Sequence, residues 1–105
     1  MKKAIIVVDM INDFVTGKLG SPRARKIVPD IASLLKKLGV DTLIILGVST
    51  DICVQNNVGH AYFSGYKTIV PEDCTASIDE KAHEQAIKYM KNIYGAQITS
   101  SDKAL

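Results

Sequence analysis

A twelve-residue stretch in the middle of the chain decides the fold and points to the chemistry. It reads Leu43-Ile44-Ile45-Leu46-Gly47-Val48-Ser49-Thr50-Asp51-Ile52-Cys53-Val54. The apolar run predicts a buried strand over residues 42–48, and the pattern that follows predicts a helix over residues 51–64. Cys53 would then lie in the first turn of that helix, just beyond the carboxyl end of the strand. Unpaired N–H groups and the positive end of the helix dipole favour the thiolate there, which is the attacking form of cysteine.

A second apolar run, Ala4-Ile5-Ile6-Val7-Val8, ends in Asp9. It predicts a parallel strand over residues 4–9, whose carboxyl end would lie at the same edge of the sheet as Cys53. The Asp9 carboxylate could accept the thiol proton there, and the N–H groups around Cys53 could bind an oxyanion. Two plainer interpretations stay open: Cys53 as a small buried apolar residue, and Asp9 as a carboxylate that binds nearby loop amides.

The rest of the chain continues the alternation of strands and helices. Residues 67–70 and 97–99 are typical of strands, whereas residues 22–38 and 78–94 have helical apolar stripes. Ser77 and Glu80 have the spacing of a capping box for the last helix. Gly59 in the middle of the 51–64 helix should destabilise it by up to about 1 kcal/mol. The sequence predicts one α/β domain over residues 1–105, a small Rossmann-like fold with a parallel four-stranded sheet and three helices.

The composition argues against several classes of protein. Of the 105 residues 47% are hydrophobic, and the net charge is only +2. The basic residues are scattered without interleaved aromatic residues, so nucleic acid is not an expected partner, and no stretch is long enough to cross a bilayer. Two cysteines without metal-ligand spacing favour a reduced, cytoplasmic protein with no metal and no cofactor, although a disulfide between Cys53 and Cys74 stays open.

Two separated motifs give the chain a family resemblance. Val8-Asp9-Met10-Ile11-Asn12-Asp13-Phe14-Val15 resembles the opening motif of the isochorismatase-like cysteine hydrolases, which include the nicotinamidases, and Gly47–Val54 resembles their nucleophile motif. The resemblance implies an enzyme that hydrolyses a small-molecule amide, with Cys53 as nucleophile and Asp9 as general base. It also implies that Phe14 lines the substrate pocket, and that the peptide between Val48 and Ser49 is a cis bond beside the oxyanion hole.

The chain also departs from the pattern of this family. The segment between the first helix and the nucleophile strand is short, so the family's catalytic lysine and its Asp/His metal ligands have no counterpart. Two strands and one helix would be absent from an otherwise isochorismatase-like fold. A second hypothesis therefore stands beside the hydrolase: a catalytically inactive, shortened scaffold, natural or engineered, that folds and dimerises.

The shortened sheet leads to an expectation about assembly. If the strands follow one another in chain order, right-handed crossovers place all three helices on one face. The other face would then be bare, and the first strand would be an exposed edge, so we expect a homodimer that covers that face. The alternative order 2-1-3-4 would place helices on both faces.

Overall fold

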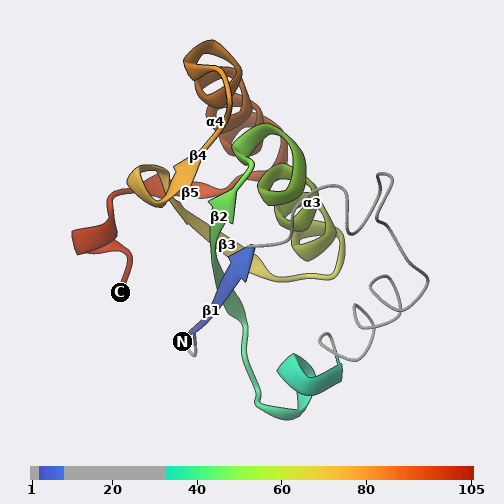
Figure 1. Ribbon diagram of the computed structural model, residues 1–105. Helices are drawn as coiled ribbons and strands as arrows, with labels where there is room; N and C mark the ends of the chain where they lie inside the picture. The colour runs from blue at the N-terminus through green and yellow to red at the C-terminus, as the bar shows by residue number, and fades with distance from the viewer. Residues whose placement is uncertain (1–2, 9–32) are drawn as a thin grey trace, which may run out of the picture.

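The computed structural model describes residues 3–8 and 33–105 of the chain. Four parallel strands form the main path of its sheet (Figure 1), in the spatial order β1-β2-β3-β5, and a short fifth strand, β4, pairs with β2 off this path. The four are β1 (Lys3–Val8), β2 (Thr42–Val48), β3 (Lys67–Pro71) and β5 (Gln97–Thr99). The predicted parallel α/β fold is confirmed, and the strands follow one another in chain order. The alternative order 2-1-3-4 is therefore wrong.

The neighbours of β2 change along its length. Its first half pairs with β3, from Thr42 opposite Lys67 to Ile44 opposite Ile69. The chain then leaves β3 through a 3₁₀ turn, η2 (Glu72–Cys74), and returns as the two-residue strand β4 (Thr75–Ala76) beside Gly47 and Val48. On the other side β1 pairs with β2 over its whole length. The carboxyl end of β2 is thus flanked by β1 and β4, and Ser77 follows β4 directly.

The helices among the described residues lie on one face of the sheet and form the main core. The predicted helix over 51–64 begins as a π-helical turn, η1 (Thr50–Val54), and continues as α3 (Gln55–Phe63). The last helix is α4 (Glu80–Tyr94), and residues 33–37 are also helical. Side chains from all of these elements meet the inward residues of β2 and β3 in one cluster. Its buried members are Leu35, Leu43, Ile45, Cys53, Val54, Val58, Ala61, Val70, Ile87, Met90 and Ala96.

The opposite face of the sheet carries a much smaller cluster. Ile44 and Ile69 are buried there, with Ala104 from the C-terminal segment packed on them and Leu46 partly buried beside them. Asp73 holds this segment, because its carboxylate accepts hydrogen bonds from the Ser101 N–H (2.8 Å) and hydroxyl (2.6 Å). The expectation of a bare second face is wrong at Ile44 and Ile69, since the tail covers part of what helices leave open.

The N-terminus of α4 is not capped by the predicted capping box. The N-cap is Asp79, whose side chain accepts a hydrogen bond from the Lys81 N–H, while the helix ends at Gly95 in the left-handed region (φ 64°). Glycine suits this position because a Cβ disfavours a positive φ. The capping box of Ser77 and Glu80 is therefore wrong, and the Ser77 hydroxyl is used elsewhere.

Gly59 allows close packing between α3 and α4. A Cβ at this position would lie 2.9 Å from the Tyr94 hydroxyl oxygen, which is closer than real Cβ contacts. The Tyr94 ring also packs edge-to-face with Phe63 and Tyr89 and at a tilt with Tyr62. The absence of a side chain at Gly59, which costs helix propensity, thus leaves room for the end of the Tyr94 side chain against α3.

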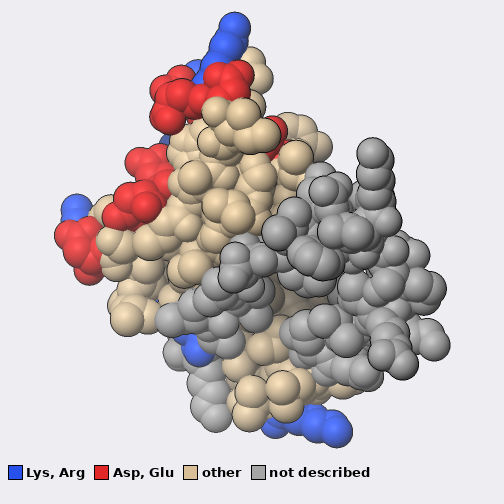
Figure 2. Space-filling model, in the orientation of Figure 1, with Lys and Arg blue, Asp and Glu red and all other residues tan. Residues whose placement is uncertain are grey.

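On the face that Figure 2 shows, the charged side chains of the described residues lie mainly at the extremities. Figure 2 shows acidic side chains over the start of α4 and around η2 and the C-terminal 3₁₀ turn η3 (Ser101–Lys103), with lysines scattered at the ends of the molecule. No basic patch of described residues is present on this face. Within residues 3–8 and 33–105, no helix is long and apolar enough to cross a membrane.

Candidate active site

Cys53 lies in the π-helical turn η1, immediately after the carboxyl end of β2. Its residue is 9% exposed and belongs to the main core cluster, while its backbone carbonyl accepts a hydrogen bond from the Asn57 side chain (2.8 Å). π-Helical turns are rare and are frequent at functional sites. Cys53 therefore lies at the start of a helix, as predicted, and its side chain is largely buried.

The turn before Cys53 changes direction sharply at residues 48–51. The Val48–Ser49 peptide bond is cis, the geometry that the family resemblance implies. The Ser49 carbonyl oxygen accepts hydrogen bonds from the N–H groups of Ile52 (3.2 Å) and Val54 (3.0 Å). These two hydrogen bonds thus stabilise the first turn of η1. The role of the Val48–Ser49 peptide beside an oxyanion hole stays a prediction.

The Asp51 carboxylate connects this turn to the segment before α4. Its Oδ1 atom accepts hydrogen bonds from the hydroxyl groups of Ser49 (2.6 Å) and Ser77 (2.8 Å). These bonds, that of Ser49 first, hold the pKa of Asp51 below its ordinary value of 3.8, and nearby His83 acts in the same direction. Asp51 is therefore ionised at neutral pH, and its negative charge in the first helical turn suits the helix dipole.

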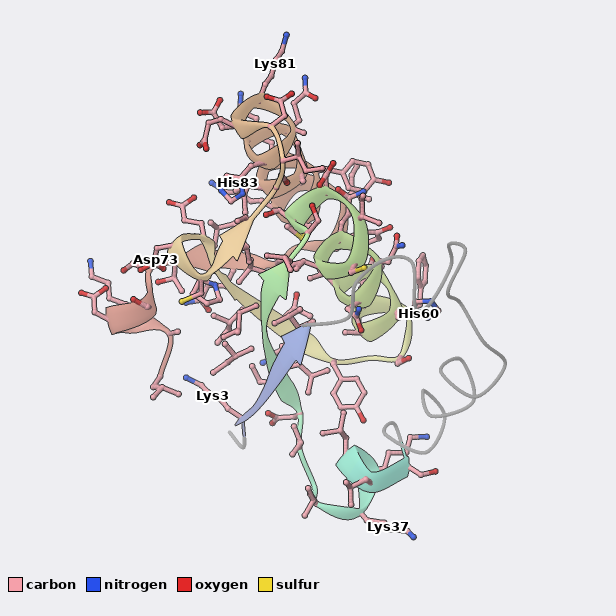
Figure 3. The ribbon with its side chains drawn as sticks, in the orientation of Figure 1. Lys3, Lys37, His60, Asp73, Lys81 and His83 are labelled. Atoms are coloured by element: carbon pink, nitrogen blue, oxygen red, sulfur yellow. The ribbon has the colours of Figure 1, made fainter. Side chains whose placement is uncertain are left out.

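A second connection joins the turn to α4 itself. Thr50 is fully buried, and its hydroxyl is 2.8 Å from Nδ1 of His83, a hydrogen bond in which either group can donate. Figure 3 shows His83 on α4 near the end of β4, while His60 lies apart on α3. The two histidines therefore do not form a common site, and only His83 reaches the turn before Cys53.

Two of the predicted site residues lie outside the described residues. Asp9, the expected base, and Phe14, the expected pocket residue, belong to residues 9–32, between β1 and the next described residue. The register of β1 and β2 places Val8 opposite Gly47. The carboxyl end of β1 therefore lies beside the point of β2 where the turn to Cys53 begins, and the approach of Asp9 to Cys53 stays a prediction.

The described side chains do not form a metal site. No three His, Cys, Asp or Glu side chains converge anywhere in the part of the chain that the structure covers. Cys53 and Cys74 form no disulfide.

Sequence reasoning missed the hydrogen-bond network around the turn. The partners in the network are 26 and 33 residues apart in the chain. No local spacing relates such residues, so no signal in a single sequence could have found these pairs.

Comparison of the chain with known proteins shows which family it belongs to. The Isochorismatase domain family matches residues 29–102, which include Cys53 but neither Asp9 nor Phe14. The uncharacterized isochorismatase family protein YaaI of Bacillus subtilis is 34% identical over 73 residues, 70% of this chain and 40% of that protein. Nicotinamidase 3 of Arabidopsis thaliana is 32% identical over 53 residues, 50% of this chain and 27% of that protein. The chain thus spans less than half the length of these relatives.

Solved structures agree on the fold. A pyrazinamidase/nicotinamidase from Streptococcus mutans superposes with a TM-score of 0.65 at 36% identity, over 66% of this chain and 38% of that one. An N-carbamoylsarcosine amidase from Thermoplasma acidophilum has a TM-score of 0.72 over 98% of both chains; at 22% identity this likeness concerns the fold alone. Because the family match covers more than half of the chain and contains the β2–Cys53 turn, this chain belongs to the isochorismatase family.

Proposed function

We propose that the chain is a cysteine hydrolase that acts on a small-molecule amide, with Cys53 as nucleophile and Asp9 as general base. The observation that carries the proposal is the position of Cys53. It lies in the helical turn that begins at the carboxyl end of a central parallel strand, inside the part of the chain that matches the family. Several relatives are named as amidases of small molecules, which supports this substrate class.

The proposed reaction has two halves. The Asp9 carboxylate takes the thiol proton, and the Cys53 sulfur attacks the amide carbonyl carbon to form a tetrahedral oxyanion. Asp9 then gives its proton to the leaving nitrogen, the C–N bond breaks, and ammonia or an amine departs from a thioester on Cys53. Asp9 next deprotonates a water molecule, whose oxygen attacks the thioester, and the carboxylic acid and the thiol are released.

The oxyanion and the substrate need further groups. N–H groups around the Val48–Ser49 peptide and the start of η1 are suited to stabilise the oxyanion, because they precede the nucleophile in the same turn. Phe14 would contact the substrate. Both roles, oxyanion binding and substrate contact, rest on the family resemblance and are part of this proposal.

The direct test is amide hydrolysis by the purified chain. Release of ammonia is measured over a panel of small primary amides that includes nicotinamide. Cys53→Ala should abolish turnover, whereas Cys74→Ala, the matched cysteine control, should keep it. A thioester on Cys53, trapped by acid quench and found by peptide mass spectrometry, would identify the nucleophile.

The two cysteines also allow a test that needs no substrate. Cys74 is more exposed than the buried Cys53. Exposure alone predicts that iodoacetamide modifies Cys74 faster, whereas an activated nucleophile predicts faster modification of Cys53. Faster labelling of Cys74, together with no turnover of any amide, would contradict the hydrolase.

One observation favours a second candidate, the non-catalytic scaffold. Cys53 packs in the main core cluster with only 9% exposure, as a structural cysteine does. In this case Cys53→Ala would mainly lower the free energy of unfolding. The labelling comparison separates the two candidates, because a structural thiol inside the core reacts slowly.

Assembly and location remain predictions beside this function. We propose a homodimer, supported now by the edge position of β1 among the described strands and by Val48, which is 46% exposed at the carboxyl end of β2. Light scattering at micromolar concentration tests it, and a monomer would contradict it. The absence of a disulfide between the two cysteines suits the predicted reducing cytoplasm.

A further inference from the structure

The turn at residues 48–51 is held to α4 by two independent side-chain connections. Asp51 accepts the hydrogen bond of Ser77, from the segment that leads into α4, and Thr50 bonds to His83 within α4. Asp51 also accepts from Ser49 inside the turn. The start of the Cys53 helix is therefore fixed from outside by residues far away in the chain.

Ordinary helix capping does not account for these bonds. Ser49 is the N-cap of η1, yet its side chain makes no capping bond and its hydroxyl goes to Asp51. The N-terminus of α4 is capped by Asp79. Ser77 is thus not needed at that helix end, and its hydroxyl is directed to the turn instead.

The network sits where a small displacement would reach the sulfur. Thr50 and Asp51 are three and two residues before Cys53, within the same π-helical turn. Thr50 is fully buried, so its hydroxyl needs a partner inside the protein, and His83 supplies it. Loss of either connection would free one side of the turn while β2 and α3 stay in place.

We propose that Asp51, Ser77 and His83 are positioning residues that hold the turn before Cys53, and through it the sulfur, in the geometry of attack. The inference rests on the proposed cysteine hydrolase and deepens it, because it names residues that act on the nucleophile through the turn rather than on the substrate. A nucleophile displaced by about 1 Å loses rate rather than substrate affinity. The network should therefore act on kcat and leave KM nearly unchanged.

The test compares variants that remove a bond with variants that keep it. Ser77→Ala removes only the hydroxyl that crosses to Asp51, and His83→Ala removes the partner of Thr50. Asp51→Asn keeps an oxygen that accepts both serine hydroxyls, and His83→Asn places an amide near the position of Nδ1. His60→Ala, on the exposed side of α3, is the matched histidine control. Asp79→Ala removes the α4 cap and is the control for a purely structural loss.

We expect Ser77→Ala and His83→Ala to lower kcat about tenfold, with KM changed by less than about twofold. Asp51→Asn and His83→Asn should keep most of the wild-type kcat. Asp79→Ala should lower the melting temperature without this loss of kcat, and His60→Ala should change neither. If Ser77→Ala and His83→Ala lower only the melting temperature, or if KM rises instead of kcat falling, the proposal is overturned.

The ratio of Cys53 to Cys74 labelling by iodoacetamide separates this inference from the proposed function. If the wild-type chain hydrolyses no amide, the hydrolase fails, yet the ratio still reports the state of the turn. A lower ratio in Ser77→Ala or His83→Ala, restored in His83→Asn, supports positioning of the sulfur. An unchanged or higher ratio in variants that keep the wild-type melting temperature overturns it. Should His83→Ala not fold, Ser77→Ala and His83→Asn carry the test.

Discussion

The two faces of the sheet are built very differently, although they share the same strands. On the helix face, side chains from α3, α4 and residue 35 form one large buried cluster with β2 and β3. On the opposite face, Ile44 and Ile69 are covered by Ala104 of a short tail that Asp73 holds. Among the described residues, whole helices close one face and a few residues of the tail close the other. We infer that the helix face carries most of the stability and that the tail face can relax.

Two neighbouring isoleucines test this difference with the largest expected effect. Ile45 faces the helices with 1% exposure, and Ile44 faces the tail with 2% exposure. Ile45→Ala should lower the free energy of unfolding by about 4 kcal/mol, and Ile44→Ala by about 2 kcal/mol, because the tail can close a cavity that helices cannot. Urea unfolding measures both. Equal losses would show that the two faces are equally rigid.

Gly59 tests how tightly the helix face is packed. Gly59→Ala should lower the free energy of unfolding by about 1 kcal/mol, because the new methyl group meets the Tyr94 hydroxyl at 2.9 Å. In a Tyr94→Leu background the same change should stabilise by about 1 kcal/mol, the gain in helix propensity. The double-mutant cycle is measured by thermal or urea unfolding. A Gly59→Ala effect that is the same in both backgrounds would contradict the close approach.

Asp51 tests the connection of the helix face to the turn before Cys53 through pH. Its pKa is lowered below 3.8 by the hydroxyl groups of Ser49 and Ser77, so its contribution to stability is present above 3.8. This contribution is lost as the pH falls through the lowered pKa. Asp51→Asn should therefore destabilise the protein at neutral pH, with a difference from wild type that shrinks in acid. Melting temperatures measured from about pH 6 to about pH 3 follow it. If the difference in melting temperature between the two proteins does not vary with pH, the hydrogen bonds to the Asp51 carboxylate are not its cause.

The tail gives the smallest expected effect. Asp73 is an exposed carboxylate whose pKa is lowered by the hydrogen bonds of Ser101. Asp73→Asn should leave global unfolding nearly unchanged, because surface interactions contribute little. It should speed amide hydrogen exchange in residues 100–105 and leave exchange in α3 and α4 as it is. Ser64→Ala, an exposed serine after α3, is the neutral control. Unchanged exchange in the tail would show that Ala104 alone holds it.

The same variant bears on assembly. A released tail would uncover Ile44 and Ile69 and increase association between copies of the chain if that face is the interface. Light scattering at several concentrations compares wild type with Asp73→Asn. Identical masses at every concentration would remove the tail face from any model of the homodimer.

Much of the fold was predictable because its signals are local. The runs Leu43–Leu46 and Ile5–Val8 are apolar at successive positions, as strands buried in a parallel sheet are, and the glycines at 65 and 95 end helices at the predicted places. The capping box at Ser77 failed for a physical reason. The Asp79 side chain caps this helix end instead, because the Ser77 hydroxyl donates its hydrogen bond to Asp51.

The candidate site divides in the same way. The order of residues alone determined that Cys53 begins a helix after a buried strand, since strand and helix periodicity change at Gly47. Only the tertiary structure decided that Ser77 and His83 bond to that turn, that the Tyr94 hydroxyl lies close to Gly59, and that a tail covers Ile44. These contacts join residues far apart in the chain. A single sequence records local conformational preference, whereas the pairing of distant side chains is fixed only when strands and helices pack together.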